Sequence, residues 1–198
     1  MHKVGLIGLG AMGRGMAASL RRAGHEIHVC DVRAEAAQEF AAQGGTACAN
    51  AAELARACDV VISVVVNAAQ TEEVLFGERG AAAAMKKGSV FVMCSTVDPQ
   101  WSIALEARLD AMGLLYLDAP ISGGAAKAAG GQITMMTAGR PEAYAKCGTA
   151  LESMAAKVYR LGDRAGPGST VKIVNQLLAG VHIAAAAEAM ALGIRAGV

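Results

Sequence analysis

Two patterns of apolar and polar residues alternate along the chain. Short runs of consecutive apolar residues, such as VVISVVV at 60–66, are typical of strands covered by helices on both faces. We predict such strands at 3–7, 26–30, 59–65, 89–93, 114–118, 133–137 and 158–161. Alanine-rich stretches with helical spacing lie between them, and we predict helices at 12–23, 33–42, 68–76, 99–112 and 141–154. The alternation predicts an α/β fold with a doubly wound, mostly parallel sheet.

The pattern changes at the glycine- and proline-rich segment GDRAGPG, residues 162–168. From Ser169 to about Ala196 the sequence predicts one long helix with no strand after it. The helix is apolar nearly all round, so it needs a partner that covers it, and we expect a homo-oligomer that buries it. Because its apolar stretch is rich in alanine and contains Glu188, we interpret it as a packed helix and expect no membrane span.

A short polar stripe interrupts this helix. Lys172, Asn175 and Gln176 are spaced i, i+3 and i+4, which places their side chains on one helix face. One interpretation is a solvent-facing strip with an extended lysine, and the other is a catalytic site.

Composition narrows the possible functions. Hydrophobic residues make up 54% of the 198 and charged residues 18%, as in a chain that forms a core. The net charge is +1 and there is no basic block, so we expect no nucleic-acid partner. The five cysteines form no C-x-x-C pair, as is typical of buried thiols in a reducing compartment, and His25 and His28 lack the spacing of metal ligands. No signal peptide precedes the first strand, and we expect a cytoplasmic protein without a metal site.

A glycine-rich turn follows the first predicted strand. Gly8, Gly10 and Gly13 have G-x-G-x-x-G spacing and open the first predicted helix. Gly8 permits the tight turn, Gly10 lets a pyrophosphate approach the backbone, and Gly13 allows close packing of helix and strand. These features predict a Rossmann-type dinucleotide site. The predicted cofactor loop comprises Gly8, Leu9, Gly10, Ala11, Met12 and Gly13.

The second predicted strand leads into an acidic residue. Asp31, 18 residues after Gly13, can accept hydrogen bonds from the adenosine ribose and would repel a 2′-phosphate. Arg33 could instead pair with a 2′-phosphate, or could be solvated in the next helix. Because Asp31 holds the strand-end position, we predict NAD as the cofactor in preference to NADP.

A second glycine loop follows the fifth predicted strand. Ser122 supplies a hydroxyl, and Gly123 and Gly124 leave backbone N–H groups open, as in a nest that binds a carboxylate. A flexible loop would have the same composition. Thr96 is another polar residue after a strand. Since ligands of open α/β sheets bind beyond the carboxyl ends of the strands, we expect these loops to gather on one edge.

Four motifs together resemble a known family. GLGAMGRGMA, CSTVDP, DAPISGG and GPGSTVKIVNQ, in this order, resemble the 3-hydroxyisobutyrate dehydrogenase (β-hydroxyacid dehydrogenase) family across essentially the whole chain. The segment that begins KIVNQLLAG is most similar to the L-threonate dehydrogenase branch. The resemblance implies oxidation of a small hydroxy acid with a nicotinamide cofactor. It also implies a family pattern of an Asn-Asn pair after the lysine, where this chain has Asn175-Gln176.

The resemblance also implies roles for individual residues. It makes Lys172 the catalytic lysine. The implied substrate contacts are Ser122, Gly123, Gly124, Asn175 and its neighbour Gln176. The implied cofactor contacts beyond the first glycine loop, Asp31 and Arg33 are Val65, Val66, Gln70 and Thr96.

The resemblance sets an expected domain organisation. We expect a dinucleotide-binding domain at 1–163, and at 164–198 the start of a long interdomain helix, with the family's all-helical second domain absent. Two functions fit this expectation: a hydroxy-acid dehydrogenase, or an NAD-binding and assembly module without catalytic activity of its own.

The hypothesis of a hydroxy-acid dehydrogenase requires a lysine whose pKa is lowered. A positioned lysine can take the hydroxyl proton as the hydride leaves the carbinol carbon. With Ser169 as N-cap, Lys172 would lie in the first helical turn, where the positive helix end and apolar surroundings disfavour its charge. Asn175 and Gln176 could bond the lysine or the substrate hydroxyls without adding charge.

Overall fold

The computed structural model describes residues 3–198, and its main element is a six-stranded parallel sheet. The strands lie in the order β3-β2-β1-β4-β5-β6. From β1 the chain first adds strands on one side, β2 and β3, and then crosses over to add β4, β5 and β6 on the other side. This is the doubly wound arrangement expected of a Rossmann-type fold. The strands are β1 (Lys3–Ile7), β2 (Glu26–Cys30), β3 (Thr46–Ala47), β4 (Val60–Ser63), β5 (Val90–Met93) and β6 (Leu115–Asp118).

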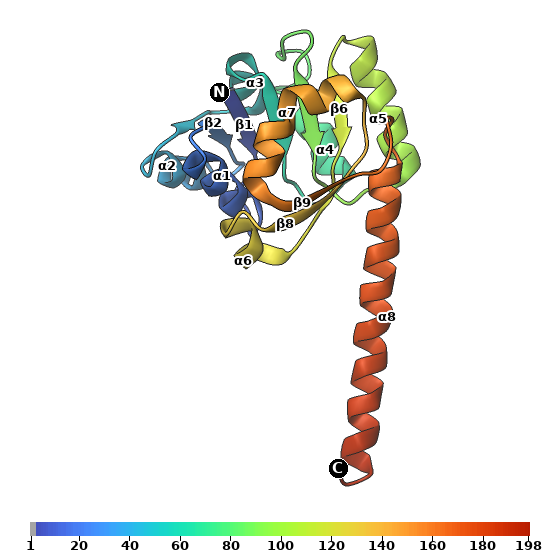
Figure 1. The fold of residues 1–198 in the computed structure, drawn as a ribbon. Helices are drawn as coiled ribbons and strands as arrows, with labels where there is room; N and C mark the ends of the chain where they lie inside the picture. Colours follow the sequence, from blue (N-terminus) through green and yellow to red (C-terminus); the bar gives the residue numbers. More distant parts are fainter. Residues whose placement is uncertain (1–2) are drawn as a thin grey trace.

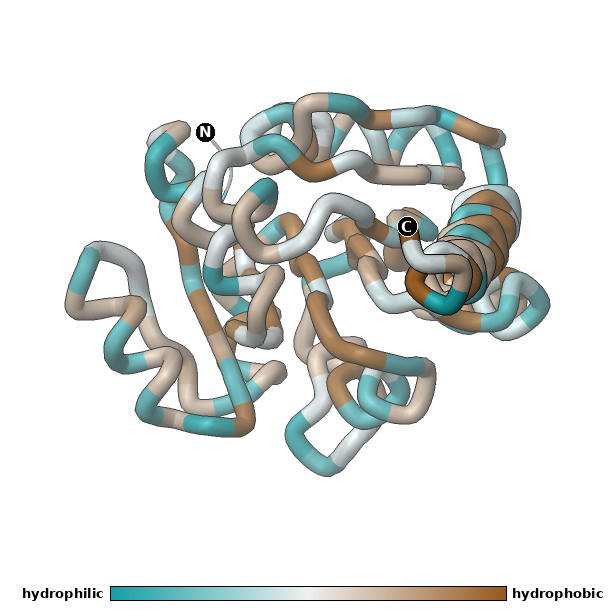
Figure 2. The backbone as a smooth tube through the Cα atoms, turned by 90° about the horizontal axis from the view of Figure 1, so that it is seen from below, coloured by the Kyte–Doolittle hydropathy of each residue, from teal (hydrophilic) through white to brown (hydrophobic). Residues whose placement is uncertain are grey.

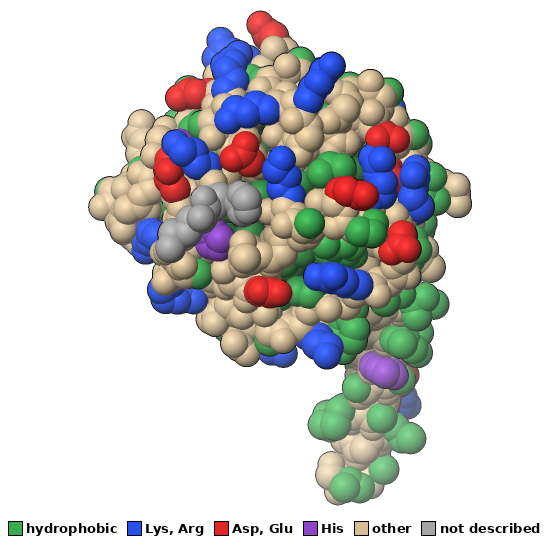
Figure 3. Space-filling model, turned by 45° about the horizontal axis from the view of Figure 1, so that its top comes forward, with side chains coloured by type: hydrophobic (Ala, Val, Ile, Leu, Met, Phe, Trp, Pro, Cys, Tyr) green, Lys and Arg blue, Asp and Glu red, His purple; other side chains and the backbone are tan. Residues whose placement is uncertain are grey.

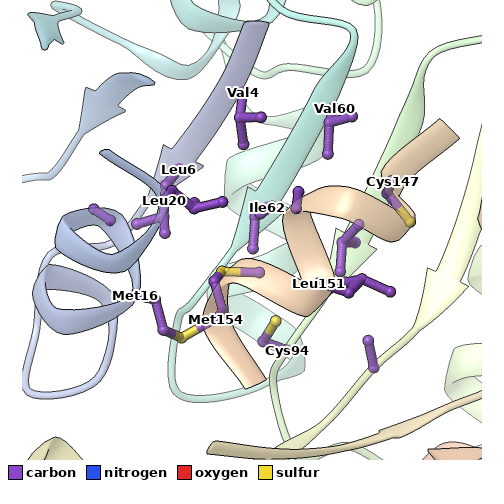
Figure 4. Packing of buried hydrophobic residues seen from close by; sticks show 14 of the residues in the cluster. Val4, Leu6, Met16, Leu20, Val60, Ile62, Cys94, Cys147, Leu151 and Met154 are labelled. Carbon is purple, nitrogen blue, oxygen red and sulfur yellow. The ribbon is translucent and has the colours of Figure 1, made fainter. Parts of the chain in front are cut away.

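Helices cover both faces of this sheet (Figure 1). Alternate residues of each strand face opposite sides, so Val60 and Ile62 join one core cluster while Val61 joins the other. Figure 4 shows the first cluster, in which Met16 and Leu151 pack against the strands. Its covering helices are α1 (Gly13–Arg22), α2 (Ala34–Ala41) and α7 (Pro141–Met154), and those of the second are α3 (Ala51–Ala57), α4 (Ala68–Phe76) and α5 (Pro99–Ala111).

The later strands form a separate, smaller sheet, which the sequence did not predict. It consists of β7 (Ile121–Ser122), β8 (Ile133–Thr137) and β9 (Ala155–Arg160), with β7 antiparallel and β9 parallel to β8. The chain turns back after β6, so that β7 pairs with β8, and the two sheets meet at an isolated bridge between Asp118 and Ala138. The strands predicted at 133–137 and 158–161 are present, and they belong to this second sheet.

Four short elements were missing from the predicted pattern: β3, β7, α3 and α6 (Gly124–Ala129). Helix α3 has a recognisable start, because Asn50 Oδ1 accepts from Glu53 N and the Glu53 carboxylate accepts from Ala49 N, both at 2.9 Å. This reciprocal arrangement resembles a capping box and could have been found in the sequence as N-x-x-E.

The long helix α8 (Pro167–Arg195, 29 residues) leaves the domain on the side where the parallel strands end and extends away from it (Figure 1). Its N-cap is Gly166, with φ at +116°, and Pro167 occupies the first helical position. The prediction that Ser169 is the N-cap was wrong. Lys172 consequently lies in the second turn, where the helix end exerts less influence on it.

Most of α8 is exposed, and apolar side chains cover much of its surface (Figure 3). Among residues 3–198 it is the one helix long and apolar enough to cross a membrane, with a mean hydropathy of 1.8 in a window of which 0% is buried. Length and composition alone do not distinguish a membrane span from a helix that packs on another protein surface.

Candidate cofactor and substrate site

The loops that carry the predicted site residues follow neighbouring strands of the main sheet. Ile7 pairs with Ser63, Ser63 with Met93, and Met93 with Asp118, so β1, β4, β5 and β6 end at the same edge. Figure 2 views the molecule from this side, with α8 running toward the viewer. The expectation that the loops gather on one edge is confirmed, and this edge is where open α/β sheets bind their ligands.

The first glycine loop has the geometry of a pyrophosphate cradle. Gly8 has φ at +98°, and a Cβ on it would lie 2.4 Å from the carbonyl oxygen of Val64. A Cβ on Gly13 would lie 1.8 Å from the carbonyl oxygen of Gly8, whereas a Cβ on Gly10 would meet nothing within 4 Å. Gly8 and Gly13 are thus required by the fold itself, while the space beside Gly10 is open for a ligand.

Helix α1 presents its N-terminus to this open space. Its N-cap, Met12, makes no side-chain hydrogen bond to the first turn. Arg14 N donates to Gly10 O at 3.2 Å, so no side chain stands between the start of the helix and the space in front of it. Leu9 is buried and anchors the loop in the core, whereas Gly10 and Ala11 are exposed. A bare backbone cradle at a helix N-terminus fits a dinucleotide pyrophosphate.

Asp31 links the end of β2 to the glycine loop. Its Oδ2 accepts from Leu9 N at 2.6 Å and its Oδ1 accepts from Arg33 N at 2.9 Å. The carboxylate therefore holds the loop, and it occupies the strand-end position from which the acidic residue of a Rossmann-type fold binds the ribose. The Arg33 side chain is 67% exposed, and its Nε lies 3.5 Å from Asp31 Oδ1. The structure places both residues at the same corner of the edge, as the sequence predicted.

The predicted cofactor contacts after β4 form a closed turn. The Gln70 side-chain oxygen accepts from Val66 N at 2.8 Å, and the Val66 side chain is 75% exposed. Val65 is half-buried, and its carbonyl accepts from Ser95 Oγ at 2.8 Å. Ser95 was missing from the prediction. It connects this turn to the loop after β5, in which Thr96 is exposed.

The second glycine loop joins β7 to α6. Ser122 pairs with Thr134 of β8, and Gly123 and Gly124 follow it with φ at +137° and +77°. Both glycines are exposed, and a Cβ on Gly124 would meet nothing within 4 Å. The conformation requires glycine at both positions. Their open backbone is consistent with the predicted carboxylate nest.

Lys172 is held in the buried part of α8. Its side chain is 6% exposed, and its Nζ donates to Gln176 Oε1 at 3.0 Å. Burial lowers the pKa of Lys172 from its usual 10.5, because the charged ammonium loses hydration. Asn175 and Gln176 are exposed on the same helix face. The stripe therefore has a buried lysine and two exposed amides, and Gln176 contacts the lysine directly.

Two buried carboxylates that the sequence prediction missed hold the start of α8. Asp118, at the end of β6 and fully buried, accepts from Gly166 N, Ser169 N and Ser169 Oγ at 3.0, 2.9 and 2.7 Å. Glu106 of α5 accepts from Arg164 Nε at 3.1 Å and Ala165 N at 3.3 Å. An acidic residue next to the second glycine loop was visible in the DAPISGG motif, but its partners lie 48 and 51 residues further along the chain.

Comparison with known proteins identifies the fold and the family. The family model described as the NAD binding domain of 6-phosphogluconate dehydrogenase matches residues 3–162. A second model, described as the NAD-binding of NADP-dependent 3-hydroxyisobutyrate dehydrogenase, matches residues 166–198. The chain therefore contains an NAD-binding domain, in agreement with the fit of the glycine cradle.

Curated relatives and solved structures agree with the family models. An L-threonate dehydrogenase of Cupriavidus necator is 60% identical over 197 residues, and the match covers 100% of this chain and 66% of the relative. A 3-hydroxyisobutyrate dehydrogenase of Pseudomonas aeruginosa is 34% identical, with the same coverages. The crystal structure of a 3-hydroxyisobutyrate dehydrogenase from Salmonella typhimurium superposes with a TM-score of 0.93 at 47% identity, covering 100% of this chain and 69% of that one.

This chain thus spans about two thirds of the length of the relatives that it matches. The match includes both glycine loops, Asp118 and the whole of α8, because the shared region covers the full chain. The chain belongs to the 3-hydroxyisobutyrate dehydrogenase family, in the branch whose curated members are named L-threonate dehydrogenases.

Proposed function

We propose that the protein is an NAD-dependent dehydrogenase that oxidises a hydroxyl of a small hydroxy acid, of the L-threonate or 3-hydroxyisobutyrate kind, to a carbonyl. The observation that carries this proposal is the buried Lys172, whose pKa is lowered, at the sheet edge where both glycine loops open. The names of the relatives support the substrate class.

In this proposal Lys172 acts as the general base. A bound nicotinamide supplies the hydride acceptor. Neutral Lys172 takes the hydroxyl proton as the carbon–oxygen double bond forms, and returns it in the reverse reaction. The lowered pKa raises the neutral fraction near physiological pH, and Gln176 orients the amine through its carboxamide oxygen. The protein thereby provides a base without placing a second charge beside the substrate.

The substrate carboxylate would lie at the second glycine loop. Gly123 and Gly124 offer backbone N–H groups on an exposed loop with open space beside Gly124, and Ser122 offers a hydroxyl. Asn175, on the same face as Lys172, would bond a substrate hydroxyl. Because the proposed substrate contacts are amide and hydroxyl groups, specificity would depend on hydroxyl positions along the acid.

The direct test is a screen of threonate, 3-hydroxyisobutyrate and glycerate with NAD and with NADP, followed at the absorbance of the reduced nicotinamide. Turnover with one of these acids that is lost in Lys172→Ala supports the proposal. Binding of NAD without turnover of any small hydroxy acid favours the second candidate, an NAD-binding assembly module, which the long exposed helix also suggests.

We also propose that the protein works as a cytoplasmic homo-oligomer in which α8 is covered. Large apolar side chains along the helix are between 52% and 72% exposed from Val174 to Ile194, and an exposed apolar surface of this extent is typical of an interaction site. The exposed residues are Val174, Leu177, Leu178, Val181, Ile183, Met190, Leu192 and Ile194. Light scattering on the purified protein tests this state, and a stable monomer would contradict it.

A further inference from the structure

We infer that Asp118 is a positioning residue for the proposed reaction: it fixes helix α8 on the domain and thereby sets the place of Lys172 relative to the substrate loop. The inference rests on the proposed role of Lys172. It concerns a residue that touches neither the cofactor cradle nor the lysine, and whose function is to hold the element that carries the lysine.

Helix α8 is attached to the domain by few residues. Of its 29 residues, the buried ones are Gly168, Ser169 and Lys172. They share one face, because Ser169 and Lys172 are three positions apart. The contact that fixes Ser169 therefore also fixes the rotation of the helix about its axis, and with it the direction in which Lys172 points.

Asp118 receives every polar contact by which the rest of the domain holds the start of α8, and we call this attachment the seat of the helix. Its Oδ2 accepts from the N–H groups of Gly166 and Ser169, and its Oδ1 accepts from the Ser169 hydroxyl. Within residues 3–198, hydrogen bonds from other elements reach α8 and its N-cap only through this carboxylate. A negative charge at a helix N-terminus is also favoured by the helix dipole.

Gly168 of α8 packs tightly against Asp118. A Cβ on Gly168 would lie 2.9 Å from the Asp118 carbonyl oxygen, 3.0 Å from its Oδ2 and 2.7 Å from the Met136 carbonyl oxygen. The helix therefore approaches the ends of β6 and β8 as closely as a backbone can. No side chain larger than hydrogen fits between them without moving α8 outward.

Asp118 lies close in sequence to the second glycine loop. It ends β6, and Ser122 of the substrate loop lies four residues later. The Asp118 backbone N–H donates to Ala138 O at 3.0 Å, and its carbonyl accepts from Ala138 N at 2.8 Å, so the residue is fixed on both sides. One rigid residue thus connects the loop that would bind the carboxylate to the helix that carries the base.

The test compares Asp118→Ala with Asp118→Asn in the protein at its full length. Asparagine retains an acceptor oxygen for the two N–H groups, and its amide can donate to the Ser169 hydroxyl, so the seat is conserved. Alanine removes all three bonds. We expect kcat for the hydroxy acid to fall on the order of 100-fold in Asp118→Ala, with an unchanged Kd for NAD, and to stay within about threefold in Asp118→Asn.

A second measurement does not depend on turnover. Acetylation of Lys172 by an N-hydroxysuccinimide ester, quantified by mass spectrometry relative to the exposed Lys127, reports whether the lysine is still buried. Labelling should rise severalfold in Asp118→Ala and stay at the wild-type level in Asp118→Asn. Thr170→Ala is the matched control, since it removes only the bond from Thr170 Oγ1 to Gly166 O at 2.9 Å.

The outcomes separate this inference from the proposed function. Unchanged kcat and unchanged labelling in Asp118→Ala, with the variant folded by circular dichroism, would overturn the inference. Should Asp118→Ala not fold, a large loss of kcat in the well-folded Asp118→Asn would overturn it, because the bonds are retained there. If the wild-type protein turns over no hydroxy acid, the proposed function has failed. The acetylation measurement still decides whether Asp118 keeps Lys172 buried.

Discussion

Lys172 donates a hydrogen bond from Nζ to Oε1 of Gln176, 3.0 Å away and one helical turn further along α8. The pair is asymmetric: the lysine is 6% exposed, whereas the glutamine is exposed. The amine is therefore shielded from bulk water but still faces a neutral group at the helix surface. This combination is what the proposed role of Lys172 as a base requires.

Replacing Lys172 by alanine should lower kcat at least about 100-fold, since general base catalysis of this kind typically contributes that much or more. The Kd for NAD, measured by fluorescence titration, should change little because the glycine cradle is built from other elements. Lys87→Ala, at an exposed position outside both glycine loops, is the matched control and should retain wild-type turnover. Near-normal turnover in Lys172→Ala would refute the catalytic role.

The pH dependence of oxidation should reflect the lowered pKa of Lys172. The rate constant kcat/KM should rise with pH as the lysine loses its proton. It should reach its plateau before the pH rises to 10.5, the usual pKa of lysine. In stability terms, the unfolded chain binds more protons than the native one between the lowered pKa and 10.5. The contribution of Lys172 to unfolding free energy should therefore increase with pH across that window.

This contribution can be isolated with Lys172→Met, which is similar in length and uncharged. The free energy of unfolding in urea should rise less with pH between 8 and 10 in the variant than in the wild-type protein, a range chosen as roughly the window below the normal lysine pKa. An identical slope in both proteins would show that burial does not perturb this lysine.

The two glycines of the cofactor loop should respond differently to alanine. Gly13→Ala places a Cβ 1.8 Å from the Gly8 carbonyl oxygen and should destabilise the fold by at least about 2 kcal/mol, or roughly 4–8 °C in Tm. Gly10→Ala meets nothing within 4 Å, so Tm should be unchanged while the Kd for NAD rises. Equal Tm losses in the two variants, measured by calorimetry, would contradict this division.

Asp31→Ser should weaken the preference for NAD over NADP about tenfold or more, because a charged hydrogen-bond acceptor is lost and a repulsive charge is removed. The ratio of kcat/KM for the two cofactors is the measurement. Since Asp31 also accepts from Leu9 N, a moderate fall in Tm should accompany the change. Arg33→Ala controls for the neighbouring charge, and an unchanged cofactor ratio in Asp31→Ser would refute the assignment.

The sequence allowed prediction of the features that depend on local pattern. The parallel strands, the glycine cradle with Asp31, and the polar stripe of α8 follow from apolar runs and glycine spacing, which a single segment expresses. The seat of α8 could not be predicted in this way. Asp118 binds groups at Gly166 and Ser169, and only the folded chain brings these segments together.

The N-cap of α8 was predicted wrongly for the same reason, because it depends on a contact between distant segments. Serine is a good helix-capping residue, so local preference favoured Ser169 over Gly166. In the folded chain the Ser169 hydroxyl is occupied by Asp118, and Gly166 adopts the positive φ of the cap. The separate sheet of β7, β8 and β9 was likewise invisible, because strand propensity does not specify which edge a strand joins.

Helix α8 is attached to the domain at one end only of the part that the structure describes. Its 29 residues extend about 43 Å, and within residues 3–198 the domain holds it only over its first turns. A tilt of about 5° at Asp118 would move the far end by about 4 Å. Subtle changes at one carboxylate would therefore be amplified into a large displacement of whatever surface the helix carries, so a substitution at Asp118 or Gly168 should disturb assembly as well as chemistry.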